Sequence, residues 1–291
     1  MAEYKIKDLE NLTGIKSHTI RIWEKRYSIL TPDRTDTKIR TYSDSELTHL
    51  LTISMLNRNG IKISKIAKLS QEDMNKLLWD IKVNKEPEYS MEKFILALVT
   101  LDEEMFKETL NGLLEAVGLE KTFTNHLIPF LDRIGIMWLI GSVNPAQEHF
   151  MSNLIRQKII SEIDKQKVPD STDKAVLMYL PEHEWHEISL LFYHFLLRSK
   201  GIPTFYLGQS LPYESLVECI EKLKPDAILT SWLTAVDNDF VIGYFKKLKS
   251  DYPNLDVFAG GAQIKSNSAS LKNYIVEVEN LSSILTKLKT Q

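Results

Sequence analysis

The feature that most constrains the fold is an alternation of strand-like and helical patterns from residue 172 to the end of the sequence. Five apolar runs are typical of strands: KAVLMYL, PTFYLG, PDAILTSWL, LDVFAGG and NYIVEV. Between them lie helical patterns, the first of which is EWHEISLLFYHFLLRSKG. Strands that alternate with helices form βαβ units, whose strands are parallel. Residues 172–291 are therefore predicted to form a doubly wound parallel α/β domain of the Rossmann-like class.

The segment before this domain shows no alternation typical of strands. A polar stretch with a proline, NKEPEYS, indicates a linker near residues 84–90. After it come long stretches with apolar residues at helical spacing, and we expect breaks at Gly118, at Pro129 and around GSVNP. Residues 88–168 are therefore predicted to form a helical bundle.

Residues 1–82 read as a third domain made of short helices. A helical pattern, YKIKDLENLTG, ends at a glycine, and Ser17 is placed to cap a second helix, HTIRIWEKRY. This layout is typical of a helix-turn-helix. The segment TPDRTDTKIRTYS then alternates charged and β-prone residues, as a hairpin or wing does, and a capped helix begins at SDSEL.

Charge separates this first domain from the rest of the chain. Residues 1–70 hold 13 Lys and Arg against 8 Asp and Glu, whereas the whole chain has a net charge of −3. A basic module on an acidic body indicates a polyanion contact at one end. The single cysteine, Cys219, excludes an internal disulfide and a cysteine-rich zinc site. No apolar run approaches the ~20 residues that cross a bilayer, so we expect no membrane contact and a cytoplasmic protein.

Three polar spots follow predicted strands of the sheet. EHEWHE follows the first strand, Thr230 and Ser231 close the third, and Gly260 and Gly261 close the fourth. Ligands of open α/β sheets bind at the carboxyl ends of the strands, so these spots share one rim. Zinc chemistry, a nucleotide site and a flavodoxin-like site are possible there, although HExxH, GxGxxG and P-loop patterns are missing. The alternative is that the rim has no binding function, and that its histidines are solvated and its glycines are an ordinary strand end.

The spacing of the three spots is more specific. It resembles the cobalamin-binding module of methionine synthases, corrinoid mutases and related regulators: acidic residue, any residue, His, two residues, Gly, then Ser-x-Leu, then Gly-Gly. Here Glu184 and His186 begin the motif, and Ser189 stands at the glycine position. After 41 residues comes Ser231-Trp232-Leu233, and after 26 more comes Gly260-Gly261.

The resemblance implies a role for each matching residue. His186 would be the lower axial ligand of cobalt, and Glu184 would accept the other ring N–H and fix the tautomer. Ser231, in the motif that ends at Leu233, would bond the displaced benzimidazole tail, and Gly260 and Gly261 would let the tail lie against backbone. His183 matches nothing in the motif, and His194 is expected to be structural.

The bundle carries a second resemblance. Trp138, nine residues, then Glu148-His149 is similar to the bundle of cobalamin-dependent, light-sensing MerR-type regulators of the CarH and LitR kind. In that family the bundle covers the upper face of the corrin, the tryptophan lies beside the upper ligand and the Glu-His pair lies near the adenosyl group. Leu139 stands where the best-known light sensors have a histidine.

The N-terminal 75 residues resemble the MerR winged helix-turn-helix. IKDLENLTGIKSHTIRIWEKRY matches its two helices, and DRTDTKIRTYSDSEL matches the wing and the following helix. The resemblance implies that the second helix enters the major groove of double-stranded operator DNA. The implied DNA contacts are His18, Thr19, Arg21, Arg26, Arg34, Arg40 and Tyr42. Ile20 and Trp23 are expected to face the core of the module.

Taken together, these resemblances imply a cobalamin-dependent transcriptional repressor and no enzyme. Adenosylcobalamin is the expected cofactor, light is expected to cleave its cobalt–carbon bond, and self-association as a dimer or tetramer is expected to set DNA affinity. Two alternatives stay open. Ser189 and Leu139 are compatible with a MerR-type regulator that has lost cobalamin and senses another ligand or partner. The second alternative is a corrinoid methyl-carrier protein. The basic N-terminal domain of residues 1–82, which we call the head, argues against it because such a carrier needs no helix-turn-helix.

Overall fold

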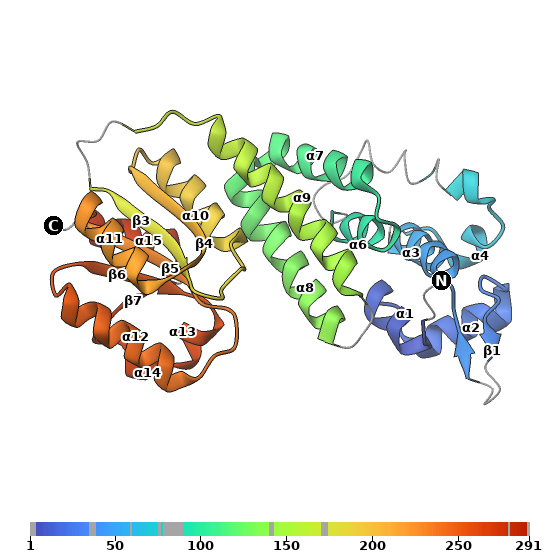
Figure 1. Ribbon diagram of the computed structural model, residues 1–291. Helices are drawn as coiled ribbons and strands as arrows, with labels where there is room; N and C mark the ends of the chain where they lie inside the picture. Colours follow the sequence, from blue (N-terminus) through green and yellow to red (C-terminus); the bar gives the residue numbers. More distant parts are fainter. Residues whose placement is uncertain are drawn as a thin grey trace. The chain divides into compact units, whose positions relative to one another are not determined.

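The computed structural model describes residues 4–34, 39–58, 60–74, 77, 90–139, 143–169, 174–278 and 280–289, without the side chains of Arg34, Asp44, Trp138, Leu139 and Lys289. The chain separates into two compact units, Met1–Leu154 and Ile155–Gln291. Figure 1 shows helices in both units and a parallel sheet in the second.

The first unit begins with the predicted helix-turn-helix and wing. Its elements are α1 (Ile6–Thr13), α2 (Ser17–Tyr27), β1 (Asp33–Arg34), β2 (Arg40–Thr41), α3 (Asp44–Arg58) and α4 (Ile63–Ile66). Gly14 ends α1 with a left-handed φ of 74°, and β1 and β2 pair antiparallel. Ile20 is fully buried, as predicted, and Trp23 is half-buried.

The predicted cap of α2 is wrong. Ser17 is the first residue of the helix, not the residue before it. Its hydroxyl donates to the Glu10 carboxylate at 2.6 Å, so it joins α2 to α1 instead of satisfying an N–H of its own helix. The cap before α3 is confirmed, because Ser43 and Glu46 exchange hydrogen bonds between side chain and backbone in both directions.

A bundle of helices follows in the same unit. It consists of α6 (Ser90–Thr100), α7 (Glu103–Thr122), a π-helical turn η2 (Phe123–Leu127), α8 (Ile128–Leu139) and α9 (Pro145–Asp164), the last of which continues into the second unit. The aromatic rings of Phe94, Phe106 and Phe130 pack together in its core.

The breaks predicted in the bundle are partly confirmed. Gly118 is non-helical, with φ 77° and ψ 167°, so α7 is kinked there. Pro129 does not break a helix: it is the second residue of α8, which follows the π-helical turn η2 directly. The π-helical turn before α8 has i→i+5 hydrogen bonds, so it contains one residue more than a turn of α-helix.

A polar joint links the head to the bundle within the first unit. Arg58, at the end of α3, pairs with the buried Glu92 of α6 and donates to the carbonyl of Thr13 at 3.1 Å. Arg133 of α8 donates to the carbonyls of Asn11 and Leu12 at 3.1 and 3.0 Å. The last carbonyls of α1, which have no intrahelical donor, are thus satisfied by two arginines from other helices.

The second unit is the predicted parallel sheet. Its elements after α9 are β3 (Val176–Pro181), α10 (Ile188–Ser199), β4 (Thr204–Leu211), α11 (Tyr213–Leu223), β5 (Ala227–Ser231), α12 (Asn238–Asp251), β6 (Asp256–Gly260), α13 (Ala262–Ser266), α14 (Ser268–Leu271), β7 (Val276–Glu277) and α15 (Leu281–Lys289). The strand order is β4-β3-β5-β6-β7, and all pairs are parallel.

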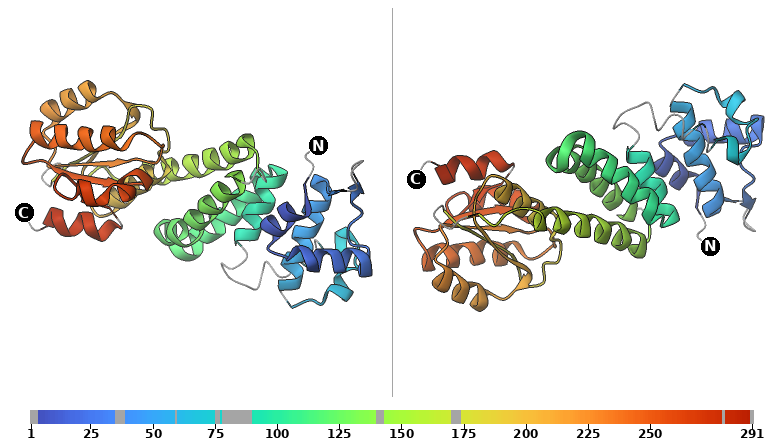
Figure 2. Two further views of the ribbon diagram at one scale, coloured as in Figure 1. Left: turned by 90° about the horizontal axis from the view of Figure 1, so that it is seen from below. Right: turned by 90° about the horizontal axis from the view of Figure 1, so that it is seen from above.

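Helices cover both faces of the sheet (Figure 2). Leu177 and Tyr179 of β3 face a core formed with α11 and α12, and Val176 and Met178 face a core formed with α10 and α15. Strand β3 is buried along its whole length, as a central strand of a doubly wound sheet should be. Thus the expected fold of residues 172–291 is confirmed.

Candidate functional site

The three polar spots meet at one rim, at the carboxyl ends of β3, β5 and β6. Tyr179 pairs with Thr230, and Ser231 pairs with Gly260, so the three strands end side by side. The chain leaves β3 towards β4 on one side and returns to β5 on the other side. The rim therefore contains the topological switch point, where open α/β sheets bind ligands.

The loop after β3 is not helical, contrary to the expectation that a helix begins at Glu184. Helix α10 starts at Ile188, and the chain leaves β3 through a turn at residues 182–183, closed by the Glu184 N–H donating to the Pro181 carbonyl at 3.0 Å. The Glu184 carboxylate binds backbone N–H groups of its own loop and of the loop after β5, the strand next to β3.

Glu184 is buried and collects donors from two strand ends. Its carboxylate accepts the backbone N–H of His186 at 3.0 Å and those of Leu233 and Thr234 at 2.7 and 2.6 Å, and the Thr234 hydroxyl at 3.1 Å. Burial raises the pKa of this carboxyl, but these hydrogen bonds and that of the His186 ring outweigh it and lower the pKa to about 2. Glu184 is therefore an anion fixed in one position.

His186 lies against this anion. Its Nδ1 is 2.6 Å from the Glu184 carboxylate, and the side chain is 63% exposed. Because an ionised carboxylate can only accept, the proton belongs on Nδ1 and the basic lone pair on Nε2. The pair thus has the chemistry of a metal-binding imidazole whose tautomer and basicity are set by a carboxylate.

Ser189 and Ser231 lie together at the same rim. Ser189 is the second residue of α10 and has no positive φ, so a serine fits the backbone here without strain. Its hydroxyl donates to that of Ser231 at 3.4 Å. Ser231 is buried, whereas Leu233 is 40% exposed. A hydroxyl pair therefore stands where the family motif has a glycine and a serine.

The two glycines at the end of β6 differ in what they contact. Gly261 has a φ of 102°, and a Cβ there would lie 2.3 Å from the Trp232 carbonyl oxygen. A Cβ on Gly260 would meet its nearest atom, the Val278 carbonyl oxygen, at 3.5 Å, which is an ordinary contact. Gly261 is thus required by the protein's own backbone, which joins the ends of β5 and β6.

The other histidines near the rim take different positions. His183 is exposed and has a left-handed φ of 67°. His194 is buried beside the Tyr206 ring, and burial and the nearby Arg198 lower its pKa to about 4, so it is neutral and structural. Within the part of the chain that the structure describes, no group of three or more His, Cys, Asp or Glu could hold a metal ion.

The candidate residues of the bundle belong to the first unit. Trp138 and Leu139 are the last two residues of α8, but their side chains lie outside the described part. Glu148 and His149 lie in the first turns of α9 with their side chains 3.4 Å apart, and the Ser152 hydroxyl donates to Glu148 at 2.7 Å. The imidazole of His149 is exposed.

Most of the candidate DNA contacts are on the surface of the head. His18, Arg21 and Arg26 are exposed on α2, and Thr19 is half-buried beside them. The side chain of Arg34 lies outside the described part. Arg40 pairs with Glu24 at 3.0 Å and is partly exposed.

Tyr42 needs a correction. It is 1% exposed, and its hydroxyl donates to Glu24 at 3.1 Å. The tyrosine at the end of the wing is therefore a core residue, whose ring packs inside the head. A buried hydroxyl of this kind does not reach a phosphate, so we remove Tyr42 from the candidate DNA contacts.

Sequence reasoning missed several residues that hold the rim together. Thr234 donates hydrogen bonds to Glu184, and Gln209 and Ser210 of β4 form hydrogen bonds with the loop that carries His186. Beside them, the buried Glu187 pairs with Arg156 of α9 and accepts the Tyr206 hydroxyl at 2.6 Å. Their sequence positions gave no signal, except that Glu187 is the third glutamate of EHEWHE.

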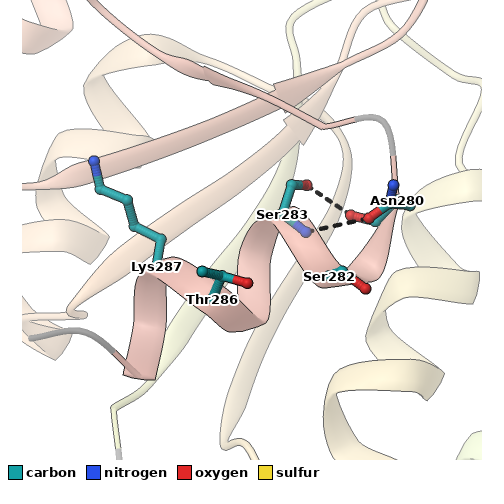
Figure 3. Close-up of a pocket in the computed structure, with 5 residues that line it drawn as sticks. All are labelled: Asn280, Ser282, Ser283, Thr286 and Lys287. Atoms are coloured by element: carbon teal, nitrogen blue, oxygen red, sulfur yellow. Dashed lines mark hydrogen bonds between the residues drawn. The ribbon is translucent and has the colours of Figure 1, made fainter.

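A hollow along α15 is separate from this site. It is lined by Asn280, Ser282, Ser283, Thr286 and Lys287 and contains none of the rim residues (Figure 3).

Among the described residues, no helix is both long and apolar enough to span a membrane.

Comparison with known proteins gives consistent matches along the chain. Residues 4–73 match the MerR HTH family of regulatory proteins, and residues 91–161 match the B12 binding domain family. The chain is 30% identical to the HTH-type transcriptional repressor CarH of Myxococcus xanthus over 96% of each chain. It is 25% identical to the repressor CarA of the same organism over 79% of this chain and 77% of CarA.

Among solved structures, the fold is similar to that of the monomethylamine corrinoid protein of Methanosarcina barkeri. The TM-score is 0.54, the sequence identity is 18%, and the match covers 67% of this chain and 95% of that protein. At this identity the similarity shows the fold alone.

Proposed function

Because this chain belongs to the MerR-type transcriptional regulators that carry a B12-binding domain, we propose that it is a cobalamin-dependent repressor that binds adenosylcobalamin and responds to light. The proposal has three parts: a ligand site at the rim of the sheet, a DNA-binding surface on the head, and self-association that links the two.

The observation that carries the ligand site is the pair formed by Glu184 and His186. A carboxylate that accepts four other hydrogen bonds is 2.6 Å from an imidazole that is largely exposed at the switch point of the sheet. Since a corrin supplies most of the ligands of its cobalt, one imidazole with a fixed tautomer is what the protein has to add. The residues at this rim therefore fit the cofactor.

The remaining rim residues support the same ligand. Ser231 lies at the end of β5 beside Ser189, and Leu233 and Trp185 offer exposed apolar surface in the loops that follow β5 and β3. When bound, adenosylcobalamin supplies a cobalt–carbon bond that visible light can cleave. From the bundle, Trp138, Glu148 and His149 are proposed as further contacts on the strength of the resemblance. Leu139 is aliphatic and would not bind cobalt, so His186 is the residue of the chain that we propose would bind it.

The head is proposed to bind duplex DNA through α2 and the wing. His18, Thr19, Arg21 and Arg26 lie along one helix, and Arg34 and Arg40 belong to the two strands of the wing. Paired half-sites require paired heads, so a change in oligomeric state changes operator affinity. We propose that the state of the cofactor sets the oligomeric state, as a dimer or a tetramer.

The test of the ligand site is retention of adenosylcobalamin by the full chain on a sizing column in darkness. We expect wild type to retain the visible absorbance of the cofactor and His186→Ala to lose it. His183→Asn is the matched control, because it removes a neighbouring imidazole and asparagine tolerates the left-handed backbone of that position. Loss in neither variant, or no retention by wild type, would contradict the proposal.

Light and DNA are tested with the same loaded protein. Green illumination is expected to change the elution volume and to lower the affinity for operator DNA relative to the dark sample. An affinity for operator DNA that changes with neither cofactor nor light would favour the regulator that has lost cobalamin. Methyl transfer from the bound corrinoid to a partner, without DNA binding, would favour the methyl carrier.

A further inference from the structure

The loop that carries His186 has an unusual backbone. His183 adopts a left-handed φ of 67°, a conformation that costs a residue other than glycine roughly 1 kcal/mol or more. The loop also has to place Glu184 under the end of β5, where it accepts the N–H groups of Leu233 and Thr234. Something must therefore hold the loop in this shape before a ligand arrives.

The end of β4 provides that support. Strand β4 is irregular there: Gly208 and Ser210 have φ of 82° and 51°, and its register with β3 shifts between the pairs Tyr179–Gly208 and Pro181–Leu211. The irregularity turns Gln209 and Ser210 away from regular pairing and towards the loop. We call these two residues the β4 bracket.

The β4 bracket binds three consecutive residues of the loop. The N–H of His183 donates to the Ser210 hydroxyl at 3.1 Å, and the Ser210 N–H donates to the Glu184 carbonyl at 3.1 Å. The Gln209 side-chain amide donates to the Trp185 carbonyl at 2.7 Å. The loop is thus held on one side by β4 and on the other by the end of β5.

We infer that Gln209 and Ser210 are positioning residues for the His186 imidazole. The contacts by which they act are to the backbone of residues 183–185. By fixing the loop, they spare the ligand the entropy of ordering it, which raises affinity without any new contact. The inference rests on the proposed function, since it assigns a purpose to the loop that holds the proposed axial ligand.

The contact of Gln209 gives the sharpest test, because its side chain is half-exposed and can be changed without opening the core. Gln209→Glu keeps the shape and removes the donor, and it brings a carboxylate to the Trp185 carbonyl. Gln209→Lys restores an N–H donor at similar reach and serves as the rescue variant. Ser210→Ala removes the acceptor for the His183 N–H by an independent route.

The first measurement uses the full chain without cofactor. Hydrogen exchange of peptides that cover residues 182–187 should be faster in Gln209→Glu and Ser210→Ala than in wild type and Gln209→Lys. Exchange in the peptides of β5 and β6 should stay unchanged. Equal exchange of residues 182–187 in all four proteins would overturn the inference.

The second measurement uses the protein loaded with cobalamin. Gln209→Glu is expected to bind cobalamin about tenfold more weakly and to show a smaller fraction with imidazole on cobalt in its visible spectrum, and Gln209→Lys is expected to restore both. If wild type binds cobalamin through His186 and Gln209→Glu is identical to it, this inference fails and the proposed function stands. If wild type does not bind cobalamin, the proposed function itself fails.

Discussion

At the scale of single residues, the glycine pair at the end of β6 separates a structural requirement from a permissive position. Gly261→Ala places a Cβ 2.3 Å from the Trp232 carbonyl oxygen at a φ of 102°. We expect it to lower the free energy of unfolding by about 2 kcal/mol or more. Gly260→Ala is the matched control and should cost less than about 1 kcal/mol. Urea unfolding of both variants measures the difference, and equal values would contradict the assignment.

The Glu10–Ser17 contact makes a pH-dependent prediction. Hydrogen bonds from the Ser17 hydroxyl and N–H lower the pKa of Glu10 to about 2. A lowered pKa contributes stability that is present above about pH 4.5 and is lost as pH falls towards 2. Ser17→Ala removes the stronger bond, so it should be less stable than wild type at neutral pH, and the difference should shrink on acidification. Urea midpoints between pH 7 and pH 3 test this, and a difference that grows in acid would contradict it.

Single residues are also where the sequence was least informative. Glu184 and His186 could be named because they are two positions apart in a recognisable motif. Thr234 and Gln209 could not, because one is 50 residues and the other 25 residues from Glu184 and both act partly or wholly through backbone groups. Tyr42 was assigned to the surface since burial of one aromatic side chain in a short wing leaves no periodic pattern.

At the scale of elements, the polar joint between α1, α3, α6 and α8 links the head to the bundle. Glu92→Gln keeps the volume and removes the buried charge that Arg58 pairs with. We expect a loss of about 1–3 kcal/mol of unfolding free energy. Glu103→Gln is the control, because its pair with Lys107 is half-exposed and should change stability by less than about 0.5 kcal/mol. Thermal unfolding of both decides, and equal shifts would show that the joint contributes nothing special.

Elements were predicted well wherever apolar periodicity was strong. The five strands after residue 172 follow from that periodicity alone, and the sheet confirms them. The short helices α13 and α14 between β6 and β7 were not predicted. Element ends were predicted less well, because they depend on tertiary contacts. The loop before α10 is held open by Glu184, and Pro129 is accommodated by the π-helical turn that precedes α8.

At the scale of the whole molecule, the charge asymmetry becomes a prediction about DNA. Arg21 is exposed on α2, and Arg21→Ala should weaken binding and reduce the slope of log affinity against log salt by about 1 if it contacts a phosphate. Lys246→Ala, on the exposed surface of α12, is the control and should leave both quantities unchanged. Fluorescence anisotropy at several salt concentrations gives the slopes. An unchanged slope for Arg21→Ala would remove it from the phosphate contacts.

The central claim is that an imidazole nitrogen of this chain binds the cobalt of cobalamin, and electron paramagnetic resonance of the protein loaded with cob(II)alamin tests it most directly. One axial nitrogen of natural abundance splits each cobalt line into a triplet. If His186 supplies that nitrogen, labelling the histidines of the protein with ¹⁵N should turn the triplets into doublets, and His186→Ala should abolish this change. Triplets that persist in the labelled protein would show that the nitrogen comes from the cofactor's own benzimidazole, and the account of the site would be wrong.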